Sequence, residues 1–102
     1  MNSEITTYPN PDNRKNWTIT AEITEPKKMS LRYIPDKLMA DHEGLILLLK
    51  KHASNIELTP EENTLNLIES VNNELVPKWL EVSYEHNGIT IKIEDEQPRI
   101  QS

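Results

Sequence analysis

Apolar and polar side chains alternate strictly along residues 17–23, and the alternation resumes over residues 29–33. A period of two residues is typical of a strand that buries one face. The segment between them, Glu25–Lys28, contains a proline and two lysines and is turn-like. The pattern therefore predicts two strands joined by a short turn, the first of them starting at Trp17.

The register of this first hairpin depends on which residues flank the turn. Pairing Glu25 with Met29 places the apolar side chains of both strands on one face, which is the arrangement that a half-buried hairpin requires. The apolar pairs expected in this register are Ile23 with Leu31 and Ala21 with Tyr33.

A second hairpin is predicted after Pro77, where residues 80–85 and 89–94 alternate in the same way. Asn87-Gly88 lies between them and favours a two-residue type I′ turn, because both positions need a positive φ angle. A loop of this length predicts apolar pairs of Tyr84 with Ile91 and Val82 with Ile93.

The stretch between the hairpins contains a strong helix-start signal at Thr59, an N-cap candidate followed by Pro60 at the first helical position. Glu62 completes a capping box with Thr59, and Pro77 ends the helix. Apolar residues follow at helical spacing and predict a buried stripe of Leu65, Ile68, Val71 and Leu75.

A further helix is predicted within Asp36–Ser54, with either Asp36 or Asp41 as its N-cap. Its expected buried stripe consists of Leu38, Leu45, Leu48, Leu49 and His52. Gly44 inside the helix costs about 1 kcal/mol relative to alanine, so this helix depends on packing for its stability.

The resulting order, β-β-α-α-β-β, predicts an α+β fold in which both helices pack on one face of a four-stranded antiparallel sheet. We expect an extended N-terminal arm over residues 1–16, a single domain over residues 17–94 and a C-terminal tail over residues 95–102.

Composition narrows the classes of function. Only 35% of the 102 residues are hydrophobic and phenylalanine is absent, so the core is lean, and association of subunits would enlarge it. The net charge of −6 argues against a nucleic-acid partner. This chain has no cysteine, no signal-peptide pattern and no apolar run of membrane-spanning length, from which we expect a cytoplasmic protein with no membrane partner.

Three segments resemble motifs of the nitrile reductase family of queuosine biosynthesis, the QueF family, which has the tunnelling fold or T-fold. Tyr8–Trp17 resembles the segment that enters the family's first strand, and Tyr33–Lys37 resembles its Tyr-Ile-Pro-Asp segment before the first helix. Val76–Val82 resembles the Asp-Pro-Lys-Tyr-Ile-Glu-Val segment that opens its third strand. The resemblance covers most of residues 8–94 and implies a T-fold whose sites form between subunits of a homo-oligomer.

The catalytic parts of that family are missing from this chain. The cysteine-containing loop that forms a thioimide with the nitrile falls on Glu25–Lys28, and the cofactor motif falls on Asp41–Ile46, which contains no lysine. Glu43 in this segment would repel a phosphate group. We therefore expect no catalytic residue of that family and no cofactor, and we favour a non-catalytic role, with a divergent enzyme of deazapurine or pterin metabolism left open.

The resemblance also assigns substrate-binding residues. The family's substrate-reading His-Glu pair falls on Pro60 and Glu61, which implies that Glu61 accepts two N–H bonds from the amino-pyrimidinone edge of a guanine- or deazaguanine-type ring. Glu62 is the second predicted substrate-binding residue, although the capping box also explains it. The ordinary explanation of Glu61 is a first-turn acid favoured by the positive end of the helix.

Other chemically capable residues have simpler explanations. The three histidines, His42, His52 and His86, lack the spacing of a zinc site, so no metal is expected. Trp17 and Trp79 each start a predicted strand and are expected in a core or an interface. An alternative function with no ligand, that of an oligomeric protein-interaction module, also fits the sequence.

Overall fold

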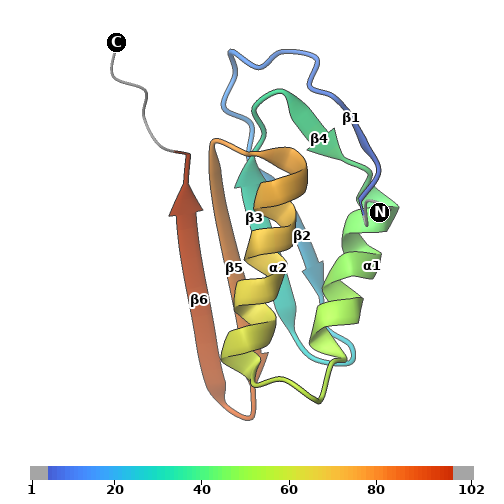
Figure 1. Cartoon of the computed structure of the whole chain (residues 1–102), viewed down its shortest axis with the longest axis vertical. Helices are drawn as coiled ribbons and strands as arrows, with labels where there is room; N and C mark the ends of the chain where they lie inside the picture. Colours follow the sequence, from blue (N-terminus) through green and yellow to red (C-terminus); the bar gives the residue numbers. More distant parts are fainter. Residues whose placement is uncertain (1–4, 98–102) are drawn as a thin grey trace.

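The computed structural model describes residues 5–97 and contains a four-stranded antiparallel sheet in the order β2-β3-β5-β6. The helices α1 (His42–Ala53) and α2 (Pro60–Leu75) cover one face of this sheet (Figure 1). The predicted α+β class and the four-stranded sheet are confirmed. The strands are β2 (Ile19–Ile23), β3 (Met29–Ile34), β5 (Trp79–His86) and β6 (Ile89–Glu96).

A separate two-stranded ribbon lies beside the start of α1, where β1 (Thr7–Pro9) pairs with β4 (Leu38–Ala40). The assignment of Leu38 to a helix was therefore wrong. Asp41 is the N-cap of α1 and its carboxylate accepts from Gly44 N at 2.9 Å, so Asp36 is not a helix cap. The partners in this ribbon are about thirty residues apart in sequence, and no local pattern signals such a pairing.

The domain boundaries predicted from the sequence stay a prediction. Within the predicted arm, residues 7–9 form a strand, and β6 extends two residues into the predicted tail, to Glu96. Residues 1–4 and 98–102, the outer parts of the predicted arm and tail, lie outside the described residues. None of the helices described is long and apolar enough to cross a bilayer.

The register of the first hairpin differs from the predicted one by two residues. Ile23 pairs with Met29, and the pairs that follow are Ala21 with Leu31 and Ile19 with Tyr33. The predicted register would have set Ile19 opposite Pro35, which has no backbone N–H to contribute to a ladder. A shift of two residues preserves the facing of every side chain, so the predicted buried face is correct although its pairs are not.

The second hairpin has the predicted register, with Tyr84 opposite Ile91 and Val82 opposite Ile93. Asn87 and Gly88 form its turn at φ angles of 52° and 81°. This is the left-handed region that a two-residue hairpin loop needs. Here the local sequence alone determines the pairing.

The core lies between the helices and the facing side of the sheet. Its sheet layer is formed by β3 and β5, whose fully buried side chains are Met29, Leu31, Tyr33, Leu80, Val82 and Tyr84. The residues that α2 buries are Asn63, Thr64, Leu67, Ile68, Val71 and Leu75. The prediction that Leu65 is among them was wrong, because Leu65 is 47% exposed and Leu67 takes its place.

The loop before β2 is held by polar contacts rather than by a strand. Trp17 lies in it, 41% exposed, and its indole donates to Asp12 O at 3.1 Å, so the prediction that β2 begins at Trp17 was wrong. Lys78 Nζ donates to Asn13 O and to Asn16 Oδ1 at 2.6 and 3.0 Å. Hydrogen bonds from the Arg14 side chain and backbone lower the pKa of Asp12. These contacts fasten the loop to the start of β5.

Candidate functional site

Glu61 and Glu62 both lie in the first turn of α2, but their side chains differ in their hydrogen bonds. Glu62 Oε1 accepts from Thr59 N at 2.9 Å while Thr59 Oγ1 accepts from Glu62 N at 3.1 Å, which is the predicted capping box. Glu61 is exposed, and its side chain makes no hydrogen bond or ion pair with any of the described residues. Its carboxylate therefore has all its acceptor positions open to solvent or to a ligand, whereas one oxygen of Glu62 is already used.

Glu61 lies on the side of α2 that faces β6. At about 100° per residue, Glu61, Leu65 and Asn72 fall within about 40° of one another around the helix axis. Asn72 marks the direction of this stripe, because its Nδ2 donates to Asp95 Oδ2 of β6 at 2.7 Å. Glu61 and Leu65 thus lie along the α2–β6 margin, nearer to the hairpin turn.

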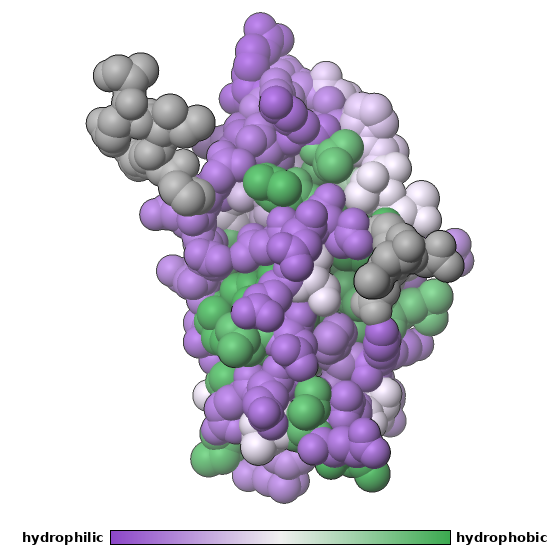
Figure 2. Space-filling view, in the orientation of Figure 1, coloured by the Kyte–Doolittle hydropathy of each residue, from purple (hydrophilic) through white to green (hydrophobic). Residues whose placement is uncertain are grey.

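Apolar side chains are exposed along this margin. Leu65 on α2 is 47% exposed and Ile89 at the start of β6 is 60% exposed. In Figure 2, hydrophobic side chains gather between the positions of α2 and β6, on a face that is otherwise largely hydrophilic. β6 is an edge strand, and no further strand of the described chain pairs with its outer side. Glu61 is thus a single carboxylate beside apolar surface and an open sheet edge.

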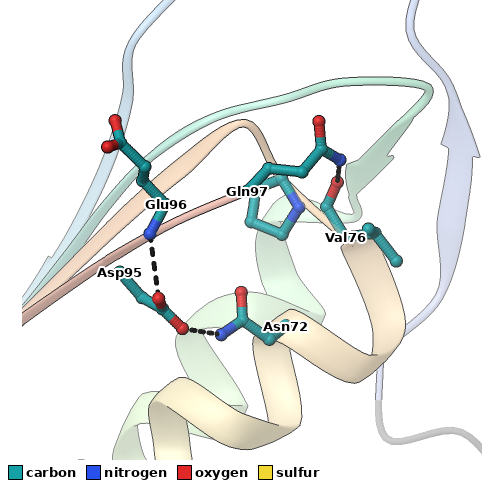
Figure 3. A pocket seen from close by; sticks show the side chains of 6 residues that line it. Asn72, Val76, Asp95, Glu96 and Gln97 are labelled. Atoms are coloured by element: carbon teal, nitrogen blue, oxygen red, sulfur yellow. Dashed lines mark hydrogen bonds between the residues drawn. The ribbon is translucent and has the colours of Figure 1, made fainter. Parts of the chain in front are cut away.

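A pocket of about 250 Å³ lies at the opposite end of the same margin (Figure 3). In Figure 3 the Asn72 amide points toward Asp95 and the Gln97 amide points toward Val76. Gln97 Nε2 donates to Val76 O at 3.3 Å and to Asp36 Oδ2 at 3.2 Å. Eleven residues of helix separate Glu61 from Asn72, about 16 Å along the axis, so Glu61 does not line this pocket.

Sequence reasoning did not find this pocket. Its lining includes Val76, which ends α2 in the left-handed conformation at φ 45°, and Gln97, whose side chain reaches back from beyond β6 to Val76 O. A valine is an unusual residue for a left-handed helix end, where glycine or asparagine is favoured. The only signal available in the sequence was the helix stop at Pro77.

Asp41–Ile46, the segment compared above with a cofactor motif, forms the start of α1. His42 and Glu43 are exposed there, and together with Ile46 and Leu47 they line a shallow, mainly apolar pocket. Leu47 is 65% exposed. None of the four lining residues is a lysine or an arginine, and the Glu43 carboxylate would repel a phosphate group, so their side chains do not favour the pyrophosphate of a dinucleotide.

The histidines are not brought together into a site. His42 begins α1, His52 lies near its end and His86 ends β5. Within residues 5–97 no group of three histidine or acidic side chains is arranged to hold a metal ion. Trp79 begins β5 as predicted, and Arg32 lies over its ring at 5.6 Å from the centroid.

Comparison with known proteins adds one finding. The sequence matches no known family profile and no curated protein. Among solved structures, it is similar to the apo form of the archaeosine synthase QueF-Like, with a TM-score of 0.55 and 15% sequence identity over 99% of this chain and 100% of that chain. At this level of identity the similarity establishes the fold, and the protein therefore has a QueF-like T-fold.

Proposed function

We propose that this protein binds a guanine- or deazaguanine-type heterocycle through Glu61, at an interface between two copies of the chain, without the covalent chemistry of nitrile reduction. The observation that carries the proposal is the exposed Glu61 carboxylate, which has no internal partner and lies beside an open sheet edge. The similarity in fold to an archaeosine synthase supports the choice of this class of heterocycle.

The chemistry suits this carboxylate. The amino-pyrimidinone edge of such a ring presents two N–H donors side by side, and the two oxygens of an ionised glutamate can accept both. Glu61 is exposed in the first turn of α2, where the positive helix end favours a negatively charged side chain. The apolar side chain of Leu65, one turn further along the helix, offers a surface for the face of the ring.

The second copy of the chain would associate along the edge strands of the main sheet. β2 and β6 are the two edges of the main sheet, with α1 packed against β2 and α2 packed against β6. Pairing β6 of one copy with β2 of the next would continue both the sheet and the helix layer, and would place α1 of one copy beside α2 of the other. Glu61 would then lie in the seam between the copies, and the exposed Leu65 and Ile89 would be covered.

Titration calorimetry with guanine, 7-deazaguanine and pterin compounds tests the binding step. We expect Glu61→Gln to weaken binding at least tenfold, because a hydrogen bond to a charged group contributes about 1.5–3 kcal/mol. Glu69→Gln makes the same charge change on an exposed residue of the same helix and serves as the matched control. Glu62→Gln should have a smaller effect, since glutamine also completes a capping box. Absence of heat with every compound would contradict the proposal.

Light scattering tests the assembly step separately. We expect an oligomer that Ile89→Lys dissociates, because a charged side chain on an edge strand opposes edge pairing. Ile56→Lys is the matched control: Ile56 is 90% exposed in the loop between the helices, away from both edges. A monomer at micromolar concentration would remove the interface from the proposal.

A second function, that of a protein-interaction module with no small ligand, has one observation in its favour. The exposed Leu65 and Ile89 form apolar surface that an oligomer interface or a different protein would bury equally well. An oligomer that Ile89→Lys dissociates, together with no heat from any heterocycle, would favour this function over ligand binding.

A further inference from the structure

The face of the main sheet opposite the helices is polar and carries an excess of negative charge. Within the described residues its cations are Arg32 and Lys92, and both are directed to one carboxylate, that of the largely buried Glu81, at 3.4 and 4.0 Å. The ladder register places four other glutamates on this face: Glu22, Glu85, Glu94 and Glu96. None of them makes an ion pair with a described residue.

Trp79 lies at one end of this face and already contacts a guanidinium group. Arg32 is 5.6 Å from the centre of the indole ring and also bonds to Glu81 Oε1. This arrangement of a guanidinium between an aromatic ring and a carboxylate combines a cation–π contact with a charge-assisted hydrogen bond. The protein therefore contains one guanidinium–indole–carboxylate contact on the β3 side of Trp79.

A pocket of about 330 Å³ lies on the other side of Trp79, toward β6, and is lined by this ring together with Glu94, Asp95 and Glu96. Both oxygens of the Asp95 carboxylate already accept a hydrogen bond, one from Asn72 Nδ2 and one from Glu96 N. Glu96 is the direct ladder partner of Trp79, and Glu94 lies two residues before it on the same face. The pocket thus has an indole ring and carboxylates, as the Arg32 contact does. No described residue places a cationic side chain in it.

We propose that this pocket binds a guanidinium group, with Trp79 under the plane of the cation and the Glu94 and Glu96 carboxylates as hydrogen-bond acceptors. A planar guanidinium fits a flat ring and two carboxylates better than an ammonium does, because it stacks and donates in its plane at the same time. The site lies on the opposite face of the sheet from the Glu61 margin and does not depend on the heterocycle proposed above.

Fluorescence and NMR titration test this site in the full chain. Trp17→Phe leaves Trp79 as the sole indole. The probes are methylguanidine, a Gly-Arg-Gly amide and, for comparison, butylammonium. We expect a saturable change in Trp79 emission and in the Glu94 and Glu96 amides with both guanidinium probes, at least threefold weaker with butylammonium. Tighter binding of the peptide than of methylguanidine identifies a protein side chain as the source, and the reverse identifies a free small molecule.

The double variant Glu94→Gln/Glu96→Gln should weaken guanidinium binding at least fivefold, since these exposed side chains can be changed without disturbing the core. Glu85→Gln removes a charge from the same face but lies far from the pocket, and should leave binding unchanged. An equal loss from Glu85→Gln would show diffuse attraction instead of a site and would overturn the proposal, as would a linear, non-saturable response. A further variant, Trp79→Leu, should abolish the preference for guanidinium over ammonium.

Discussion

The two hairpins of the main sheet resemble each other in composition and differ in what fixes their register. In the β5–β6 hairpin, Asn87-Gly88 supplies two positive φ angles, and the pairing follows from the turn. In the β2–β3 hairpin, five residues separate Ile23 from Met29, and no residue in that loop requires a particular pairing. The contrast shows that alternation determines which face is buried, whereas a turn or a neighbouring strand determines the partners.

The neighbouring strand fixes the first hairpin. β3 is also paired with β5, where Met29 lies opposite Tyr84 and the adjacent Lys28 O accepts from Glu85 N at 2.9 Å. Met29, Leu31 and Tyr33 are also fully buried, in the core between the sheet and the helices. β3 is therefore held in place by β5 and by the helices above it, as well as by β2.

The largest effect should come from the buried layer of β3. Leu31→Ala removes a side chain with 0% exposure and should destabilise the fold by about 2–5 kcal/mol, through lost burial and a cavity. Urea denaturation measures this change. Thr20→Ala, on the exposed face of β2, is the control and should stay within about 0.5 kcal/mol. A loss below about 1 kcal/mol for Leu31→Ala would show that burial does not hold this hairpin.

Removing the hydroxyl groups of the two buried tyrosines, one from each hairpin, should destabilise the fold by smaller and unequal amounts. Tyr33 OH accepts from Ala40 N at 3.1 Å, and Tyr33→Phe leaves that buried N–H without a partner, at a cost of about 1–3 kcal/mol. Tyr84 OH donates to Ala53 O at 3.3 Å, a longer bond, and Tyr84→Phe should cost about 0.5–1.5 kcal/mol. Thermal denaturation of both variants checks the order, and equal costs would contradict it.

Substitutions in the two hairpin turns should differ in their effect on stability. Gly88→Ala places a side chain at φ 81° in open space, so its cost of about 1–2 kcal/mol arises from the backbone alone. Lys27→Ala, in the loop of the first hairpin, should change stability by less than about 0.5 kcal/mol. Parallel denaturant unfolding of both variants tests the claim that only the second turn is specified by its residues. Equal sensitivity would refute it.

Alkaline pH should weaken both hairpins together, with no effect near neutrality. Burial raises the pKa of Tyr33, against a smaller lowering by its bond to Ala40 N, and burial likewise raises the pKa of Tyr84. Below about pH 10 both tyrosines are protonated in the folded and unfolded chains, and the fold keeps its full stability. As the pH rises above this value the unfolded chain releases these protons first, so the free energy of unfolding falls.

Denaturant unfolding measured from pH 8 to pH 11 follows this decline. Tyr33→Phe should flatten it, because the variant removes one of the two protons that link stability to pH. A decline as steep in this variant as in the parent chain would mean that other groups, such as the lysines, control alkaline unfolding.

In the candidate site, too, some features depend on neighbouring residues in the sequence and others on contacts between distant ones. The capping box of Thr59 and Glu62 could be predicted because all its atoms lie within four consecutive residues. That Glu61 faces β6 could not, since it depends on how α2 is rotated against the sheet, which the Asn72–Asp95 bond reveals. The binding roles of Glu61 and Glu62 stay predictions.

The sequence by itself determined the α+β class, the buried face of the four hairpin strands, the capped start of α2 and the register of the Asn-Gly hairpin, since each depends on residues a few positions apart. Only the tertiary structure decided the register of β2 against β3, the pairing of β1 with β4 and the exposure of Leu65. It also brought Trp79 beside Glu94 and Glu96. These features join residues that are distant in the chain, and their energies come from burial and pairing that exist only once the layers have assembled.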